Sequence, residues 1–131
     1  MAIKGDLDMD KNILRMGEIY WVDLGRPEFE FVQAGWHPAL IIQNNKGNYF
    51  GNTIIVIPIT SKRKTYLPTH VKVKAGNFGL TRDSIFQCEG QRLVSKSQVG
   101  SYIGQVDRKT MAKIANACLI NTPYNEMLKY S

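Results

Sequence analysis

The sequence has few of the features that mark several large classes of protein. It holds two cysteines in 131 residues, Cys88 and Cys118, far apart and each among apolar neighbours. We interpret them as small buried residues in a reducing compartment, with neither a disulfide nor a metal site expected. The longest apolar stretches, such as Ile54–Ile59, fall well short of the roughly 20 residues that span a membrane. The first residues lack the continuous apolar segment of a secretion signal, so we expect a cytoplasmic protein.

Motifs of several enzyme classes are also missing. The sequence contains no GxxxxGK[ST] phosphate-binding loop, no GxGxxG, no CxxC, no HExxH and no GxSxG. No acidic residue occurs between positions 31 and 82, which argues against a divalent metal held there by several carboxylates. Any chemistry in this region is therefore expected to use polar and basic groups, without a metal or cofactor.

The charge that is present is distributed unevenly. The formal net charge is +6, from 17 Lys and Arg against 11 Asp and Glu. The whole excess lies in residues 31–82, which contain basic side chains and no acid. Clustered positive charge attracts partners that carry phosphates. This block favours a polyanionic partner such as nucleic acid, and a solubilising basic face is the alternative.

The length and composition, with 44% hydrophobic and 21% charged residues, are typical of one folded domain. We expect residues 1–15 to form a loosely held arm with a short helix around Lys11–Arg15, and residues 16–131 to form the domain. Short alternating or apolar segments between Gly- and Pro-rich turns predict strands. They are Glu18–Leu24, Pro38–Gln43, Thr53–Thr60, Thr69–Lys74, Ser84–Cys88 and Arg92–Ser95.

Two of these strands are almost continuously apolar, as central strands buried on both faces are. They are Pro38–Gln43 and Thr53–Thr60. The second contains Pro58, so we expect a bulge there or an amide position that faces outward. Asn44–Asn48 is predicted as a turn, and Val99–Val106 as a glycine-interrupted segment.

One helix is predicted near the end of the chain. Asp107 is a suitable N-cap, and an apolar face follows at helical spacing. The face comprises Met111, Ile114, Ala115, Cys118 and Leu119, and Thr122-Pro123 ends the helix. Together with the strands, this helix predicts a mainly β fold, a small curled barrel capped by a C-terminal α-helix.

Cleavage of RNA by its own 2′-hydroxyl suits a site without metal or clustered carboxylates. It requires a base, an acid, and positive charges or donors around the phosphorus. His37 lies at a loop–strand junction and is the candidate for proton transfer. Thr60 precedes the basic run Lys62–Lys64 and is a candidate donor to phosphate. Ordinary structural roles are the alternative for both residues, and are what we expect for His70.

Aromatic residues near the first loop are a further candidate feature. Phe29, Phe31 and Trp36 lie there among polar residues. Such side chains stack on unpaired bases in proteins that bind single strands. They equally suit packing over the barrel mouth or a contact between subunits, and the pattern does not separate these roles.

Several segments together resemble the MazF/PemK/Kid family of toxin endoribonucleases. Their order and spacing carry the likeness, which covers about residues 16–121. The segments are 17–24 (GEIYWVDL), 35–44 (GWHPALIIQN), 53–60 (TIIVIPIT), 67–71 (LPTHV), 79–84 (GLTRDS), 89–93 (EGQRL) and the predicted helix at 107–120.

The resemblance implies a small SH3-like β-barrel with a C-terminal α-helix, acting as a cytoplasmic homodimer. It implies cleavage of single-stranded RNA at short sequences without metal, leaving a 2′,3′-cyclic phosphate and a 5′-hydroxyl, and an acidic antitoxin as protein partner. Carried over to this chain, it implies catalysis by His37 and Thr60. The residues implied to bind RNA are Gln33, Trp36, Ser61, Lys62, Arg63, Lys64, Arg82, Glu89 and Arg92.

The sequence departs from the family pattern at the position before Pro38, where the family usually has arginine and this chain has His37. Val32 also stands where a glutamate often precedes the residue matching Gln33, and Gln87 stands where some members have arginine. His37 has three interpretations. It is a working substitute that moves protons, an inactivating change that permits expression of a lethal toxin, or the mark of a silent relative that only binds RNA. The similar barrel of the gyrase poison CcdB adds a protein-directed toxin as a further alternative.

Overall fold

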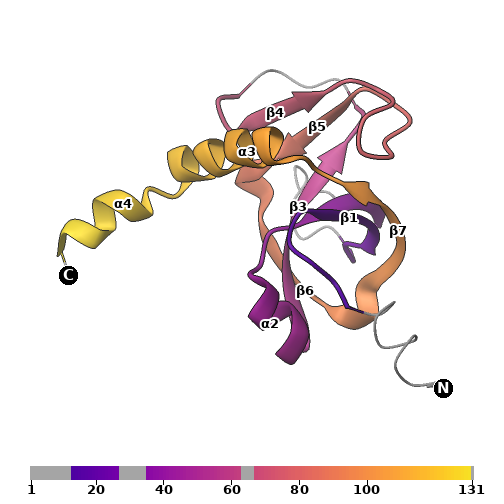
Figure 1. The fold of residues 1–131 in the computed structure, drawn as a ribbon, viewed down its shortest axis with the longest axis horizontal. Coiled ribbons are helices and arrows are strands. Elements are labelled where there is room, and N and C mark those ends of the chain that lie inside the picture. Colours follow the sequence, from indigo (N-terminus) through magenta and orange to yellow (C-terminus); the bar gives the residue numbers. More distant parts are fainter. Residues whose placement is uncertain (1–12, 27–34, 63–66, 131) are drawn as a thin grey trace.

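The computed structural model describes residues 13–26, 35–62 and 67–130. In this part of the chain a curved seven-stranded sheet is crossed by a long helix (Figure 1). The strands are β1 Glu18–Asp23, β2 Trp36–Ile41, β3 Thr53–Thr60, β4 His70–Val73, β5 Ser84–Gln87, β6 Arg92–Ser95 and β7 Val99–Gln105. The helices are α2 Asn45–Phe50, α3 Arg108–Asn121 and α4 Tyr124–Met127, with short 3₁₀ turns η1 Cys88–Gly90, η2 Lys96–Gln98 and η3 Leu128–Tyr130.

The sheet is antiparallel throughout, in the order β4-β5-β3-β2-β1-β7, with β6 added on β3. The expectation of a mainly β, barrel-like fold with a C-terminal helix is confirmed. The barrel is open, because β4 and β7 end the strand order. Each predicted strand region overlaps an observed strand, and the bounds of β3 and β6 agree with the prediction, whereas β2 begins two residues before the predicted Pro38.

The central strands are buried on both faces, as predicted. Neighbouring residues of a strand point to opposite faces, and here they enter different cores. Leu40 and Ile57 belong to the core that α3 covers, which also contains Ile114. Ala39 and Val56 belong to a second core on the other face of the sheet. The apolar runs of the sequence thus supply two cores at once.

Pro58 is accommodated because β3 changes partner at this point. Along one edge β3 pairs with β2. Along the other edge it pairs with β6 from Thr53 to Val56 and with β5 at Ile59 and Thr60. Pro58 lies in the gap between these two ladders, where a residue without an N–H is tolerated. Gly90 of η1 faces the proline ring there, since a Cβ at Gly90 would lie 3.5 Å from it.

The prediction of a turn at Asn44–Asn48 is wrong, because α2 forms from Asn45. The Asn44 side chain accepts a hydrogen bond from the Gly47 amide at 2.8 Å and so caps the helix. Asn48 is buried, and its side chain donates to the Gln43 carbonyl at 2.8 Å. The polar, turn-like composition has a low helix propensity. These side-chain hydrogen bonds stabilise the helix nevertheless.

Two further segments differ from what the sequence predicts. Residues 99–105 form strand β7, which pairs with β1 and contains bulges. The predicted helix around Lys11–Arg15 is absent at residues 13–15, and positions 11 and 12 lie outside the described residues. Leu14 is buried in the second core instead, so contacts with the barrel begin within the expected arm.

Helix α3 begins as predicted. Asp107 caps it by accepting a hydrogen bond from the Thr110 amide at 2.8 Å. Hydrogen bonding from the Thr110 side chain, and then from this amide, holds the pKa of the Asp107 carboxyl below its usual value. Its buried residues are Ile114 and Ala117, whereas Ala115 of the predicted face is exposed. The helix ends before Thr122, and the short helix α4, which the sequence did not predict, leads away from the sheet (Figure 1).

The turn between β4 and β5 packs tightly on β7. A Cβ at Gly79 would overlap the carbonyl oxygen of Ile103, and a Cβ at Gly104 would overlap that of Phe78. Gly79 also has a φ of +81°, in the left-handed region that favours glycine. This contact of main chain with main chain joins the β4–β5 hairpin to β7 across the open side of the barrel.

We therefore expect Gly79→Ala to destabilise the protein more than Gly76→Ala. Gly76 has a similar φ of +90° but open space where a Cβ would be, so its substitution measures conformational strain alone, about 1–2 kcal/mol. Gly79→Ala adds the overlap with Ile103 and should cost about 3 kcal/mol or more. Urea unfolding of both variants measures the difference. Equal losses would show that the contact with β7 is loose.

The two cysteines come together between η1 and α3, although they are far apart in sequence. The side chain of Cys118 packs against the core that contains Cys88. A hydrogen bond between the two thiols, and then burial, raises the pKa of Cys88. The same hydrogen bond lowers the pKa of Cys118, because the Cys88 S–H donates to its thiolate.

Alkylation should distinguish the two cysteines. Cys118 is half-buried with a lowered pKa and Cys88 is buried with a raised one, and the thiolate is the reactive form. Iodoacetamide at pH 8 should modify Cys118 first and Cys88 only on unfolding. Cys88→Ala should slow the reaction of Cys118, because its thiolate loses a donor. Peptide mass spectrometry follows both sites, and faster labelling of Cys88 would contradict this arrangement.

Candidate active site

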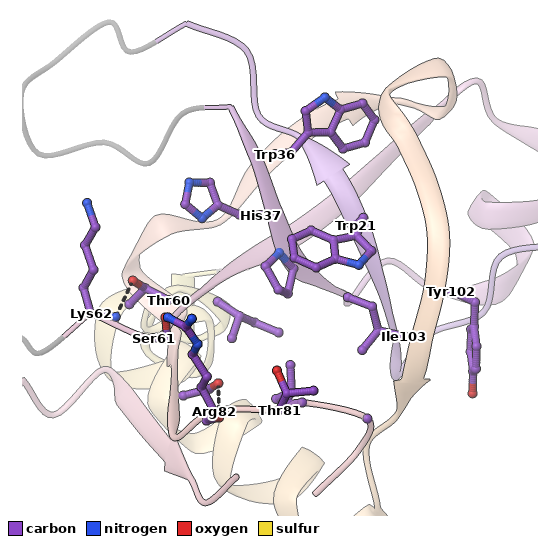
Figure 2. A pocket seen from close by; sticks show the side chains of 15 residues that line it. Trp21, Trp36, His37, Thr60, Ser61, Lys62, Thr81, Arg82, Tyr102 and Ile103 are labelled. Carbon is purple, nitrogen blue, oxygen red and sulfur yellow. Dashed lines mark hydrogen bonds between the residues drawn. The ribbon is translucent and has the colours of Figure 1, made fainter. Parts of the chain in front are cut away.

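A hollow of about 660 Å³ opens at one end of the sheet. It lies where the start of β2 meets the end of β3, and the turn before β5 and the middle of β7 complete its wall. We call it the cleft (Figure 2). The predicted site residues that line it are Trp36, His37, Thr60, Ser61, Lys62 and Arg82.

The register between β2 and β3 brings the two predicted catalytic residues together. Ala39 pairs with Pro58 in this antiparallel ladder. The ladder ends at this pair, and the cleft opens beyond it. His37 and Thr60 lie two residues further along β2 and β3, and both line the cleft. Figure 2 shows both side chains on the same side of the cleft. The pair is thus a consequence of strand pairing rather than of loop geometry.

Thr60 and His37 differ in burial and in hydrogen bonding. Thr60 is buried, and its Oγ1 accepts a hydrogen bond from the Lys62 amide at 3.1 Å. The hydroxyl hydrogen of Thr60 stays available for an acceptor in the cleft. The half-buried His37 ring makes no hydrogen bond to any residue that the structure describes. An imidazole in this setting can exchange a proton with a bound ligand.

Positive charge lies next to this pair. Lys62 and the guanidinium of Arg82 are on the same side of the cleft as His37 and Thr60 (Figure 2). Among the described residues that line the cleft there is no acidic side chain. Cations without acidic neighbours stabilise negative charge that develops on a phosphate. The cleft is therefore suited to a phosphodiester rather than to a cationic ligand.

Aromatic side chains form the opposite side of the cleft, and sequence reasoning found one of them. Trp36 is 57% exposed, Trp21 is 42% exposed and Tyr102 is 54% exposed, and all line the cleft. Trp21 occupies the exposed position of β1, a signal that could have identified it. Phe29 and Phe31, also predicted to stack on bases, lie outside the described residues.

Glycine makes room for Trp36. A Cβ at Gly100 of β7 would lie 3.0 Å from the Trp36 ring, so any larger residue would press on the indole. The ring rests on the main chain of β7 while one side stays open to solvent. This placement leaves a flat, partly exposed aromatic surface at the edge of the cleft.

Other predicted RNA-binding residues lie elsewhere. Glu89 and Arg92 do not line the cleft. Glu89 accepts a hydrogen bond from the Thr69 hydroxyl at 2.9 Å, and its other oxygen lies 3.0 Å from Nε2 of the buried His70. Glu89 thus ties η1 to the start of β4. Gln33, Arg63 and Lys64 fall outside the described residues.

In the described ranges no group of three or more His, Cys, Asp or Glu side chains is placed to hold a metal ion. None of the helices in those ranges has the length and apolar character needed to cross a membrane.

Comparison with known proteins shows a match over most of the chain. The profile of the family described as "PemK-like, MazF-like toxin of type II toxin-antitoxin system" matches residues 15–121. Endoribonuclease EndoA of Bacillus subtilis is 37% identical over 110 residues, which cover 83% of this chain and 94% of that protein. Endoribonuclease MazF of Staphylococcus saprophyticus is 33% identical over 106 residues, covering 80% and 88%.

This chain is also similar in fold to solved structures of endoribonucleases. One is an endoribonuclease in complex with its cognate antitoxin from a mycobacterial species. It superposes with a TM-score of 0.67 at 28% identity and covers 82% of this chain and 93% of that chain.

Tryptophan fluorescence should report occupancy of the cleft, because both tryptophans of the chain line it. A single-stranded oligonucleotide with 2′-O-methyl groups should quench the emission and protect it from acrylamide, since bases stack on indoles. Trp36→Phe should remove part of the response, and Trp21→Phe another part. An oligonucleotide that binds by fluorescence anisotropy without changing the emission would place its bases outside the cleft.

Proposed function

Because the chain belongs to the family of PemK-like, MazF-like toxins of type II toxin–antitoxin systems, we propose that it is a toxin endoribonuclease that cleaves single-stranded RNA in the cytoplasm. The observation that carries the proposal is the placement of His37 and Thr60 in one cleft, together with Lys62 and Arg82. This arrangement combines a proton-transfer group, a hydroxyl donor and positive charge.

The proposed reaction follows from these groups. Neutral His37 takes the proton of a ribose 2′-hydroxyl, and the 2′-oxygen attacks the adjacent phosphorus. Thr60, Lys62 and Arg82 stabilise the negative charge on the phosphorane. The bond from phosphorus to the 5′-oxygen then breaks, and the imidazolium of His37 returns a proton to that oxygen. The products are a 2′,3′-cyclic phosphate and a 5′-hydroxyl, so the reaction needs neither water nor a metal ion.

The aromatic side of the cleft supports an unpaired substrate. Trp21, Trp36 and Tyr102 present partly exposed rings, and such rings stack on bases that are free of a partner strand. A duplex keeps its bases within the helix, so it gains nothing from these rings. We therefore propose single-stranded RNA, with short sequences selected by the cleft.

Within this proposal, His37 is a working substitute for the arginine that the family resemblance leads us to expect. The imidazole has no partner among the described residues. Imidazoles as a class serve as general acids and bases, which guanidinium groups do not. Arg82 then supplies the permanent charge.

We also propose two protein partners. A second copy of the chain forms a homodimer, and an acidic antitoxin neutralises the basic block at residues 31–82. A related structure holds an endoribonuclease with its cognate antitoxin. Acidic and basic surfaces attract each other at long range, so the antitoxin is expected to compete with RNA for the cleft.

Incubation of the pure protein with an mRNA and EDTA tests the reaction. We expect cleavage at a short recurrent sequence, with fragments that carry a 2′,3′-cyclic phosphate and a 5′-hydroxyl. Sequencing of the cleaved ends gives both the end chemistry and the cut site. Intact RNA with retained binding would indicate a silent binder. Inhibited supercoiling by gyrase with intact RNA would indicate a protein-directed toxin.

Substitution of His37 tests its role. His37→Ala should lower the cleavage rate by about 10² to 10⁴, the usual contribution of acid–base catalysis, while thermal melting stays unchanged. The wild-type rate should vary between about pH 5 and 8, where imidazoles gain and lose a proton. His37→Arg should remove that variation. A large gain in rate for His37→Arg would instead identify His37 as an inactivating change.

The phosphate contacts have a matched control. Arg82→Ala should weaken cleavage because it removes charge from the cleft, whereas Arg108→Ala, at an exposed position on α3, should not.

A further inference from the structure

A second hollow of about 450 Å³ adjoins the cleft. Ser61, Lys62 and Ser84 line both hollows, so the two share a wall. The second hollow continues over the β4–β5 hairpin, and Lys72, Lys74 and Asp83 also line it. We call it the hairpin hollow.

The charge of the hairpin hollow is mainly positive. Lys62, Lys72 and Lys74 are exposed lining residues, and Asp83 is the acidic residue among those described there. The Asp83 carboxylate accepts a hydrogen bond from the Ala75 amide at 2.9 Å, which engages part of its charge within the hairpin turn. An anionic ligand is therefore favoured over a cationic one.

Two lysines lie where β4 ends. Lys72 is within the strand, and Lys74 directly follows its last residue, Val73. Both line the hairpin hollow, and residues two apart in an extended chain are at most about 7 Å from each other. This distance is of the same order as the separation of neighbouring phosphates in an extended single strand. The hydrogen-bonded ladder with β5, which pairs Lys72 with Ile85 and Val73 with Ser84, holds Lys72 and the residue before Lys74 in place.

The hairpin hollow differs from the cleft in lacking aromatic side chains among its described lining residues. Bases are held by stacking and by contacts with their edges, whereas lysine binds phosphate as a point charge without regard to sequence. The cleft thus combines rings with a catalytic pair, and the hairpin hollow offers charge alone.

We propose that the hairpin hollow is a second RNA subsite, in which Lys72 and Lys74 bind phosphates of nucleotides that flank the cleaved bond. The inference rests on the proposed ribonuclease function and extends it. A strand held in the cleft passes the shared residues Ser61 and Lys62 and continues over the hairpin. The chain then cleaves longer RNA more efficiently than RNA that fills the cleft alone, whatever the flanking sequence.

The test compares two double variants on two substrates. Lys72→Gln with Lys74→Gln removes charge from the hairpin hollow. Lys46→Gln with Lys96→Gln removes the same charge near α2 and η2, which lie away from the hairpin (Figure 1). The short RNA is the smallest that the wild type cleaves, and the long RNA adds flanks of scrambled sequence. Thermal melting verifies that every variant is folded.

We expect the hairpin variant to cleave the short RNA as the wild type does and to lose the advantage of the long one. Each phosphate contact contributes about 0.7 to the dependence of log kcat/KM on log salt concentration, so losing two should lower the slope by about 1.4. On the long RNA, the ratio of wild-type to variant kcat/KM should then shrink about sevenfold between 50 and 200 mM salt. Each single variant should show about half the change in slope, and the control double variant none.

Several outcomes would overturn the proposal. An equal loss on short and long RNA would show that the lysines act through the cleft, and no loss on either would show that the hollow does not bind RNA. If the wild type cleaves nothing, the proposed function fails, and binding of a labelled 2′-O-methyl oligonucleotide decides the subsite. Unchanged binding in the hairpin variant then overturns it. If the hairpin variant binds poly-glutamate more weakly than the wild type but binds RNA equally well, the hollow is a site for an acidic protein segment.

Discussion

The double role of strand β3 is the constraint on which the rest of the structure depends. It pairs with β2 along one edge and with β6 and then β5 along the other, and its side chains fill cores on both faces of the sheet. Because both edges and both faces are occupied, its register is fixed. The position of Thr60 at its end is then fixed as well, and with it the centre of the cleft.

The site follows from that register. The ladder between β2 and β3 ends next to the cleft, so His37 and Thr60 both reach its wall. The change of partner at Pro58 brings β5 and the preceding turn with Arg82 alongside. The tight contact between Gly79 and β7 adds Tyr102 and Ile103 to the wall. A rigid frame of this kind holds polar groups in place before a ligand binds, which is what stabilisation of a developing charge requires. Two cations of the basic block, Lys62 and Arg82, thereby lie in the wall of the cleft.

Much of the fold could be predicted because its signals are local. The alternation in β1, the apolar runs of β2 and β3 and the capped apolar face of α3 each lie within a few neighbouring residues. The failures have one local and one long-range cause. At Asn44–Asn48 the composition is typical of a turn, and the hydrogen bonds of Asn44 and Asn48 overrode it. In β7 the glycines that weaken the strand signal are required by contacts with distant residues, Phe78 at Gly104 and Trp36 at Gly100.

The sequence by itself determined strands β1 to β6, the long helix and the basic block. It also supplied the candidates His37, Thr60, Ser61, Lys62, Arg82 and Trp36. Tertiary structure decided which candidates share a cleft. It added Trp21 and Tyr102 to that cleft, engaged Glu89 with His70 and Thr69, and placed Lys72 and Lys74 on an adjoining hollow. The physical reason is that periodicity tells which face of a strand a residue occupies, whereas pairing between strands distant in sequence decides which residues meet.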